Sequence, residues 1–297
     1  MIIIKPKFEI IEQQYDDDLL KDMFKHIELC GRTCYKSEDK ITDTSYEKFI
    51  KMLTDSEHGA MLEHGTVYLH STDSALTDRY DRNRFSHVNR KGAEAFITTN
   101  MRVLAENKWL DDLKFISSYT PDFERRITVH FTTQVGVTRE YNRHRANSMA
   151  EQSTRYCNYS KDKFGGEISI NMPTWIADEE DVNKVDEASR NTLVTLCQQL
   201  ISNTDKDWTA IDNWLFANLA AEAAYMNMIA MGHKPQEARV VLPLDINTEL
   251  VHTGLVKDWK HFFDLRALGT TGAPHPDAKV LALPLMEEFK KLGYVKS

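Results

Sequence analysis

The chain has 297 residues, of which 41% are hydrophobic and 28% are charged, and its formal net charge is -8. This length and composition are sufficient to bury one large core, so we expect a single domain over residues 1–297. The acidic balance disfavours a general nucleic-acid or anionic-membrane binder, because such proteins usually need a broad positive face. An anionic ligand must therefore be bound by a local basic cluster.

The first ten residues, MIIIKPKFEI, combine a short apolar run with an early proline, which is not the pattern of a signal peptide. The sequence contains no apolar run of the roughly eighteen residues that indicate a membrane span. The cysteines, which form no CxxC pair and so favour neither a disulfide framework nor a cysteine zinc site, are Cys30, Cys34, Cys157 and Cys197. We expect a cytoplasmic protein with reduced thiols.

The amino-terminal half predicts alternating extended and helical elements. A short apolar strand comes first, followed by helices at about 16–30 and 44–54. Residues 71–125 are polar and weakly periodic at first, then helical in pattern at about 93–114, which predicts an inserted helical lobe. From Arg126 apolar and polar residues alternate strictly, as in a half-buried strand.

The carboxy-terminal half predicts mostly helices. Residues 180–203 are amphipathic at helical spacing, and residues 211–231 are apolar on nearly all sides, with Gly232 as a C-terminal cap. A helix with so little polar surface usually lies at the centre of a fold or in a subunit interface, so we expect an oligomer. The remaining elements are a short proline-led helix within 234–243, an extended segment at 247–253, a helix at 255–268 and a last helix at 277–292. Together these elements predict a mixed α/β (α+β) fold, with a central twisted sheet flanked by helices.

The segment TREYNRHRANSMAEQSTRY, residues 138–156, has four arginines and almost no aliphatic content, so it cannot form a core. If it begins with a turn or two of helix, Arg139 and Arg143 lie one turn apart, and Ser148 with Glu151 matches a capping box. The planar fork of arginine binds phosphate or a polarised carbonyl at two points. A salt-bridged surface helix is the alternative, but the neighbouring serine, glutamine and glutamate side chains favour a ligand with a polar edge.

A second candidate is an arginine in an otherwise apolar stripe. Leu255, Trp259 and Phe262 recur at helical spacing. Arg266 continues this stripe, where a charge requires an anionic partner. An arginine that extends to solvent at a helix C-terminus is the alternative. Arg239, set among apolar residues, indicates a buried charge more weakly, and helix capping is the alternative there.

Other catalytic patterns are weak or absent. His58 and His64 each follow a glutamate, but no HExxH pattern accompanies them, so we expect hydrogen-bonded histidines and no metal site. Ser153 or Cys157 with His144 as a base would make a nucleophile pair, which spacing alone cannot establish. Neither the GxGxxG nor the P-loop signature of nucleotide sites occurs.

The string Arg143-His144-Arg145, seven residues and then Ser153 resembles the signature of the flavin-dependent thymidylate synthases. Five more segments resemble those of the family and occur in the same order, at 31–42, 57–65, 157–170, 235–243 and 258–267. The resemblance covers most of the chain apart from the lobe at 71–125.

The resemblance implies a homotetramer whose active sites are shared between subunits, each site holding FAD, dUMP and a folate. In such an enzyme NADPH would reduce the flavin, methylenetetrahydrofolate would supply the one-carbon unit, and the reduced flavin would supply the hydride. The products would be dTMP and tetrahydrofolate, formed without a nucleophilic cysteine.

The resemblance also implies roles for individual residues. Arg266 would be catalytic, because it would sit against the uracil ring and stabilise its ionised N3. The residues that would bind dUMP are Glu140, Arg143, Glu151, Gln152, Ser153, Arg155, Arg239 and Arg266. The residues that would contact the flavin are His58, Arg143, His144, Arg145, Glu151, Lys257 and His261.

This chain departs from the family pattern near its last catalytic helix. Leu255 and Lys257 stand where the family usually has an asparagine and an arginine that contact FAD. Because leucine cannot form hydrogen bonds, part of that contact must be lost or replaced. The spacing before His275 also differs, and the resemblance assigns no role to the lobe.

Two rival hypotheses remain open. A flavin enzyme of the same fold could transfer a different one-carbon state to the pyrimidine, for example a hydroxymethyl group, and the mass of the product would separate the two reactions. A non-catalytic nucleotide-binding module, in which the arginines hold phosphate alone, would bind no flavin.

Overall fold

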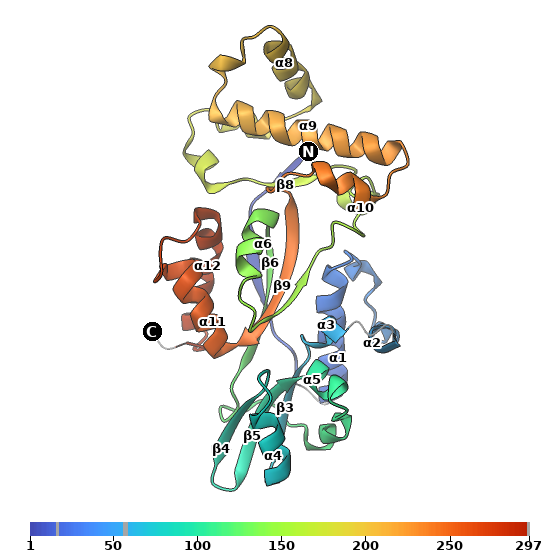
Figure 1. Ribbon diagram of the computed structural model, residues 1–297, viewed down its shortest axis with the longest axis vertical. Coiled ribbons are helices and arrows are strands. Elements are labelled where there is room, and N and C mark those ends of the chain that lie inside the picture. The colour runs from blue at the N-terminus through green and yellow to red at the C-terminus, as the bar shows by residue number, and fades with distance from the viewer. Residues whose placement is uncertain (16–17, 56–58, 296–297) are drawn as a thin grey trace.

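The computed structural model describes residues 1–15, 18–55 and 59–295, and its elements form an elongated molecule (Figure 1). In this described part the strands form three sheets, of two, four and three strands. The four-stranded sheet lies in the middle of the molecule, the three-stranded sheet at one end and helices α8 (Arg190–Ile201) and α9 (Ala210–Ala230) at the other. The predicted mixed α/β class is therefore confirmed.

The central sheet has the strand order β2-β6-β9-β7, and all its pairs are antiparallel. Its strands are β2 (Lys7–Ile11), β6 (Arg126–Gln134), β9 (Asn247–Leu255) and β7 (Ser148–Glu151). The strand predicted from Arg126 is confirmed as β6, and Ile127, Val129 and Phe131 lie in the largest core cluster. That cluster covers one face of the sheet with α11 (Val256–Phe263) and α12 (Pro276–Lys291).

The other face of the central sheet is covered by α1 (Leu19–Thr33). His26 on α1 bonds the hydroxyl of Thr128 on β6 at 3.0 Å. Helices α1 and α2 (Ser45–Asp55) confirm the helices predicted at about 16–30 and 44–54, and a short helix that was not predicted follows as α3 (Gly59–Leu62). The first strand, β1 (Ile2–Ile4), pairs in parallel with β8 (Ser169–Asn171).

Residues 66–115 build the three-stranded sheet and the helices around it. The elements are β3 (Thr66–Ser71), α4 (Ser74–Asp81), β4 (His87–Lys91), β5 (Glu94–Asn100), α5 (Met101–Glu106) and the 3-10 turn η2 (Leu110–Phe115). The helix predicted over 93–114 is wrong for its first part, because β5 is the central strand between β3 and β4. The β-branched residues of β5 and its burial from Ala95 to Asn100 favour a strand there. The lobe is therefore not purely helical, and its being an insertion stays a prediction.

The segment after β7 contains the 3-10 turns η3 (Asp162–Phe164), η4 (Thr174–Asp178) and η5 (Asp205–Asp207), and the helices α7 (Asn183–Asp186), α8 (Arg190–Ile201) and α9 (Ala210–Ala230). The helix predicted over 211–231 is confirmed as α9, whereas the amphipathic stretch at 180–203 forms two helices, α7 and α8, instead of one. Gly232, with a φ of 94°, ends α9 as predicted. The apolar α9 lies at one end of the molecule and not at its centre (Figure 1), so of the two places predicted for it only a subunit interface remains, as a prediction.

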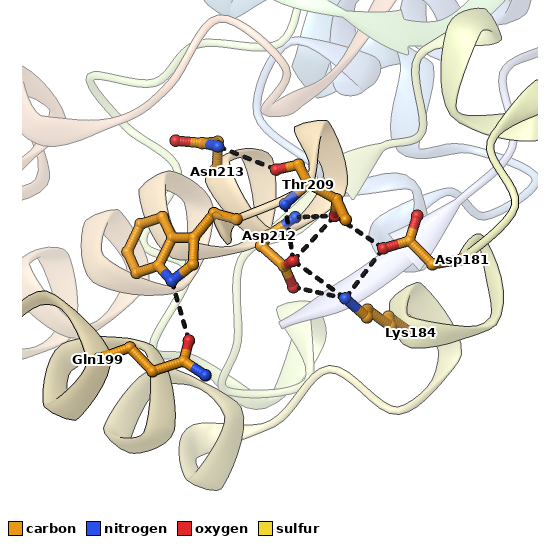
Figure 2. A network of polar contacts seen from close by, with 7 residues as sticks. Asp181, Lys184, Gln199, Thr209, Asp212 and Asn213 are labelled. Carbon is orange, nitrogen blue, oxygen red and sulfur yellow. Dashed lines mark hydrogen bonds and ion pairs between the residues drawn. The ribbon is translucent and has the colours of Figure 1, made fainter. Parts of the chain in front are cut away.

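The N-terminus of α9 is fixed by a polar network (Figure 2). Lys184 lies 2.9 Å from carboxylate oxygens of both Asp181 and Asp212, and Thr209 and Asp212 form a capping box. The indole N–H of Trp208 donates to the Gln199 side chain at 2.8 Å, which ties α8 to the start of α9.

The last elements are α10 (Pro235–Ala238) with the 3-10 turn η6 (Arg239–Val241), then β9, α11, the π-helical turn η7 (Asp264–Leu268) and α12. They confirm the proline-led helix, the extended segment and the two final helices. In the described ranges, no helix has the length and the apolar content that crossing a membrane requires.

Candidate active site

The arginine-rich motif connects two strands of the central sheet. Strand β6 runs directly into α6 (Val135–Tyr141), and a turn then leads into β7. The predicted capping box at Ser148 and Glu151 is wrong, because both residues lie in β7 and pair with Thr253 and Leu250 of β9. The buried backbone of this segment forms its hydrogen bonds within the sheet. Because no helix begins at Ser148, there is no helix N-terminus for the two side chains to cap.

Arg266 has the anionic partner that its place in an apolar stripe predicts. Its guanidinium forms an ion pair with the Glu140 carboxylate, donates from Nη2 to the Glu140 carbonyl at 2.8 Å and from Nε to His144 Nε2 at 3.1 Å. These bonds use three of the five N–H donors of a guanidinium, so two have no partner among the residues that the structure describes. Because the side chain is only 13% exposed, the two remaining donors lie in a largely water-excluded place.

His144 lies beside Arg266 as a neutral base. Its ring centroid is 5.0 Å from that of Phe262 and 5.7 Å from that of His261. Burial, followed by the charges of Arg266 and His261, lowers the pKa of His144 to about 4. At neutral pH its Nε2 therefore accepts the Arg266 bond and its proton lies on Nδ1.

We expect the free energy of unfolding to fall as the pH decreases from 6.5 toward 4. His144 takes up its proton near pH 6.5 when unfolded but only near pH 4 when folded, so acid favours the unfolded chain. The loss from this residue is about 3 kcal/mol across that window. Urea unfolding at several pH values measures it, and His144→Asn should reduce the slope. His233→Asn, at a side chain that is 50% exposed, is the control, and equal slopes in both variants would contradict the expectation.

Glu151 and Gln152 are fixed where the motif leaves the sheet. The Glu151 carboxylate accepts from the Thr138 hydroxyl at 2.6 Å and from the Asn142 amide at 2.8 Å, two partners that the sequence did not indicate. Gln152 is buried and donates its backbone N–H to the Glu249 carbonyl at 2.7 Å. Its side-chain Oε1 has no hydrogen-bond partner among the residues that the structure describes, so it is a free acceptor.

The loop after β7 meets two distant segments. Ser153 donates its backbone N–H to the Cys34 carbonyl at 2.9 Å. Arg155 donates to the Gln236 side chain at 3.2 Å, and Arg239 donates to the hydroxyl of the residue after Ser153 at 3.3 Å. The structure thus brings together Ser153, Arg155 and Arg239, three of the side chains predicted to bind the nucleotide.

The side chains of the motif form two groups, one before β7 and one after it, and within one chain β7 separates them. Arg145 precedes β7 and Ser153 follows it, and Ser148 and Glu151 alone are three residue steps apart, which is about 10 Å along a strand. Arg143 and Arg145 are exposed and form no ion pair within the described ranges.

A cleft of about 490 Å³ lies on the Arg145 side of β7. Its lining residues are Arg84, Phe85, Asn100, Arg126, Arg145, Ala146, Ser148, Leu255, Lys257 and Asp258. The cleft therefore includes Arg145 and Lys257, two of the residues predicted to contact a flavin. Arg84, Arg145 and Lys257 form no ion pair with a carboxylate in the described part of the chain, so the cleft carries cationic charge that an anionic ligand can neutralise.

Asn147 is a polar residue of the motif that the sequence reasoning missed. It is 7% exposed, and neither its amide oxygen nor its amide nitrogen bonds to a described residue. It packs closely on Gly254, where a Cβ atom would lie 2.5 Å from Asn147 Oδ1. Buried amides are nearly always hydrogen-bonded, so Asn147 is a further candidate for contact with a ligand.

Three predicted histidines have different outcomes. His58 lies outside the described residues. His64 is buried and bonds the Thr253 hydroxyl at 2.8 Å, which confirms a hydrogen-bonded histidine. His275 caps α12 by accepting the Asp277 backbone N–H at 3.2 Å. Within the described ranges, histidine, cysteine and carboxylate side chains form no cluster of three that could hold a metal ion.

Comparison with known proteins shows which family this chain belongs to. The sequence model described as thymidylate synthase complementing protein matches residues 93–292. A UMP/dUMP methylase, PolB from Streptomyces cacaoi bound with 5-Br dUMP, shares 15% identity; the likeness covers 98% of this chain and 93% of that chain, with a TM-score of 0.42. For PolB bound with 5-Br UMP the identity is 15%, the likeness covers 98% of this chain and 92% of that chain, and the TM-score is 0.43. A search of curated protein sequences found no match. Because the family match spans more than half of the chain, this protein belongs to the thymidylate synthase complementing proteins, the flavin-dependent thymidylate synthases, and is a methyltransferase.

Proposed function

We propose that this enzyme converts dUMP to dTMP by reductive methylation, with methylenetetrahydrofolate as the one-carbon donor. FAD, reduced by NADPH, supplies the hydride that completes the methyl group. The observation that carries the proposal is Arg266, a largely buried guanidinium with two unused donors beside the family motif.

Arg266 activates the pyrimidine electrostatically in this proposal. A guanidinium stays protonated at every working pH, and its donors stabilise negative charge on a nearby ring nitrogen. Ionisation of the uracil N3 increases the electron density at C5, which then attacks the one-carbon unit. Glu140 and His144 hold the guanidinium in place through three hydrogen bonds.

Three of the four thiols support a mechanism without a cysteine nucleophile. Burial raises the pKa of Cys34 to about 12 and also raises the pKa values of Cys30 and Cys157. These thiols therefore stay protonated at neutral pH, and a thiol is a much weaker nucleophile than a thiolate.

The loop after β7 is the proposed nucleotide site. Arg155 and Arg239 are exposed cations whose planar forks suit a phosphate, and the Ser153 hydroxyl can donate to the same group. The free Oε1 of Gln152 provides a hydrogen-bond acceptor nearby. Glu151, which is bonded to Thr138, Asn142 and Thr248, holds α6 against β7 and so fixes the start of this loop.

The cationic cleft fits the negatively charged diphosphate of FAD. In this proposal Arg143, Arg145 and Lys257 bind the cofactor, and His144 and His261 lie next to it. Asn147, whose buried amide has no partner among the described residues, lies in the chain between Ala146 and Ser148 of the cleft lining. Leu255 provides only an apolar wall of the cleft.

We also propose a homotetramer with shared active sites. The cleft and the nucleotide loop lie beyond opposite ends of β7, so a neighbouring subunit could complete each of them. Helix α9 offers an apolar surface for association, with Ala217 and Ala223 exposed. Sedimentation equilibrium of the purified chain tests this proposal.

Arg143→Ala is expected to weaken the binding of both FAD and dUMP by roughly tenfold or more, the loss typical of one charged hydrogen bond. Arg143 is exposed, has no ion pair in the described ranges and lies in the turn between α6 and β7, at the same end of β7 as Arg145. Fluorescence titration measures the affinity for FAD, and calorimetry that for dUMP. Arg139→Ala, one helical turn earlier and also exposed, should change neither affinity. Unchanged binding of both ligands by Arg143→Ala would refute the shared role.

Absorption spectroscopy tests the proposed cofactor. The purified chain should acquire a flavin spectrum when FAD is added, and NADPH should bleach that spectrum without oxygen. Addition of dUMP and methylenetetrahydrofolate should then restore it. A chain that binds dUMP but never FAD would instead be a nucleotide-binding module, and the proposal would be wrong.

A further inference from the structure

The loop between α4 and β4 places a phenylalanine and an arginine in the cationic cleft. Phe85 and Arg84 both line it, and their loop is fixed by hydrogen bonds. The Asn83 side chain accepts the Phe85 backbone N–H at 2.9 Å, and the Ser86 hydroxyl bonds that of Thr99 on β5 at 2.8 Å. The two cleft residues are therefore presented by a turn that is anchored to the three-stranded sheet.

Arg84 has no carboxylate partner within the described ranges, although the chain has more acidic than basic residues. Its guanidinium lies 4.5 Å from the centre of the Phe85 ring, and that ring is 45% exposed. By contrast, Arg90 in the next strand lies 3.2 Å from carboxylate oxygens of both Asp78 and Asp81. An unpaired arginine stacked on an exposed ring can serve a ligand that has both a negative charge and a planar ring.

The facing residues of the cleft complete such a site. Arg145 and Lys257 bring two further cations without a carboxylate partner in the described residues. Arg126 is already engaged, because it donates to the Glu63 carbonyl, Thr66 and Ser148. Leu255 forms an apolar wall and offers no hydrogen bond. Cationic contacts to a ligand in this cleft must therefore come largely from Arg84, Arg145 and Lys257.

We propose that Arg84 and Phe85 are FAD-binding residues: Arg84 contacts the diphosphate together with Arg145 and Lys257, and Phe85 packs on a ring of the cofactor. The proposal rests on the proposed function, which provides the flavin. Both residues precede residue 93, where the family match begins. This assigns part of the 71–125 lobe to the cofactor site of the enzyme.

The test is a titration of the full-length, flavin-free chain with FAD, followed by the quenching of flavin fluorescence. Arg84→Ala should weaken FAD binding by roughly tenfold or more, as expected for loss of a charged hydrogen bond. Phe85→Ala should weaken it by about fivefold or more, as expected for loss of a stacked ring, and Phe85→Tyr should restore it. The affinity of Arg84→Ala should also depend less steeply on salt, because one cation no longer contacts phosphate.

Two control variants come from the same lobe. Arg90→Ala removes an arginine that is ion-paired away from the cleft, and Leu110→Ala removes a side chain that is 46% exposed, close to the exposure of Phe85. Both should bind FAD like the wild type, and thermal unfolding should show that all variants are folded.

Failure of the wild-type chain to bind FAD would contradict the proposed function and this proposal together. If the wild type binds FAD and both Arg84→Ala and Phe85→Ala bind it equally well, only the role of the lobe is overturned. A loss of folate or dUMP affinity in these variants, without a loss of FAD affinity, would also overturn it.

Discussion

Replacing Arg266 with alanine is expected to slow dTMP formation by roughly 10²- to 10³-fold, the usual effect of removing one donor that stabilises charge in a transition state. The guanidinium is 13% exposed and held by Glu140 and His144, so its two unused donors need no rearrangement to meet charge on the substrate. Turnover under saturating dUMP measures the effect. The loss should appear in kcat as well as in kcat/KM, because the contact strengthens in the transition state.

Two further variants show whether the effect is specific to the planar guanidinium of Arg266. One keeps the positive charge at this position, and the other removes a different arginine of the motif. Arg266→Lys keeps a positive charge but loses the planar fork, so most of the activity should still be lost. Arg139→Ala removes an exposed arginine of the same motif and should keep normal turnover. A folded Arg266→Ala variant with near-normal turnover would show that this residue does not activate the substrate.

Replacing Trp259 with alanine is expected to reduce the free energy of unfolding by about 3–5 kcal/mol, the range for deleting a large buried ring. Trp259 is fully buried, and its indole N–H donates to the Ile127 carbonyl at 3.0 Å. Its ring contacts Phe131 on the sheet, Phe262 on α11 and Phe289 on α12, so it joins three elements of the largest core. Denaturation with urea measures the change.

Trp175→Ala is the matched control for Trp259. Trp175 is 41% exposed, so its removal leaves no comparable cavity and should cost well under half as much. Similar losses in the two variants would contradict the view that the cluster between β6, α11 and α12 is the main core. Because α11 leads directly into the turn that carries Arg266, Trp259→Ala should also lower activity.

The periodicity of the sequence predicted those elements whose apolar residues all face one surface of the core. Strand β6 followed from the alternation of Ile127, Val129 and Phe131, because one face of that strand packs on the core. Helix α9 and its cap followed from an apolar run that ends at a glycine, and Gly232 has the positive φ of such a cap. The anionic partner of Arg266 followed from a charge in an apolar stripe, although its identity, Glu140, did not.

The errors lie where distant segments decide the local structure. Residues 94–100 form a central strand because β3 and β4 pair on both sides, whereas their local sequence favours a strand only through the β-branched residues Ile97, Thr98 and Thr99. Ser148 and Glu151 match a capping box by spacing, but β9 provides a sheet edge about 100 residues later in the chain, and the backbone pairs with it. The meeting of Arg84 with Arg145 and Lys257 in one cleft depends on the same long-range packing.

The most direct test of reductive methylation is the mass of the nucleotide that the purified enzyme forms from dUMP, with FAD, NADPH and methylenetetrahydrofolate present. We expect a product heavier than dUMP by the replacement of one hydrogen with a methyl group, and no such product without the folate. A product carrying a hydroxymethyl group, or unchanged dUMP with a folded and flavin-loaded enzyme, would contradict reductive methylation by this chain.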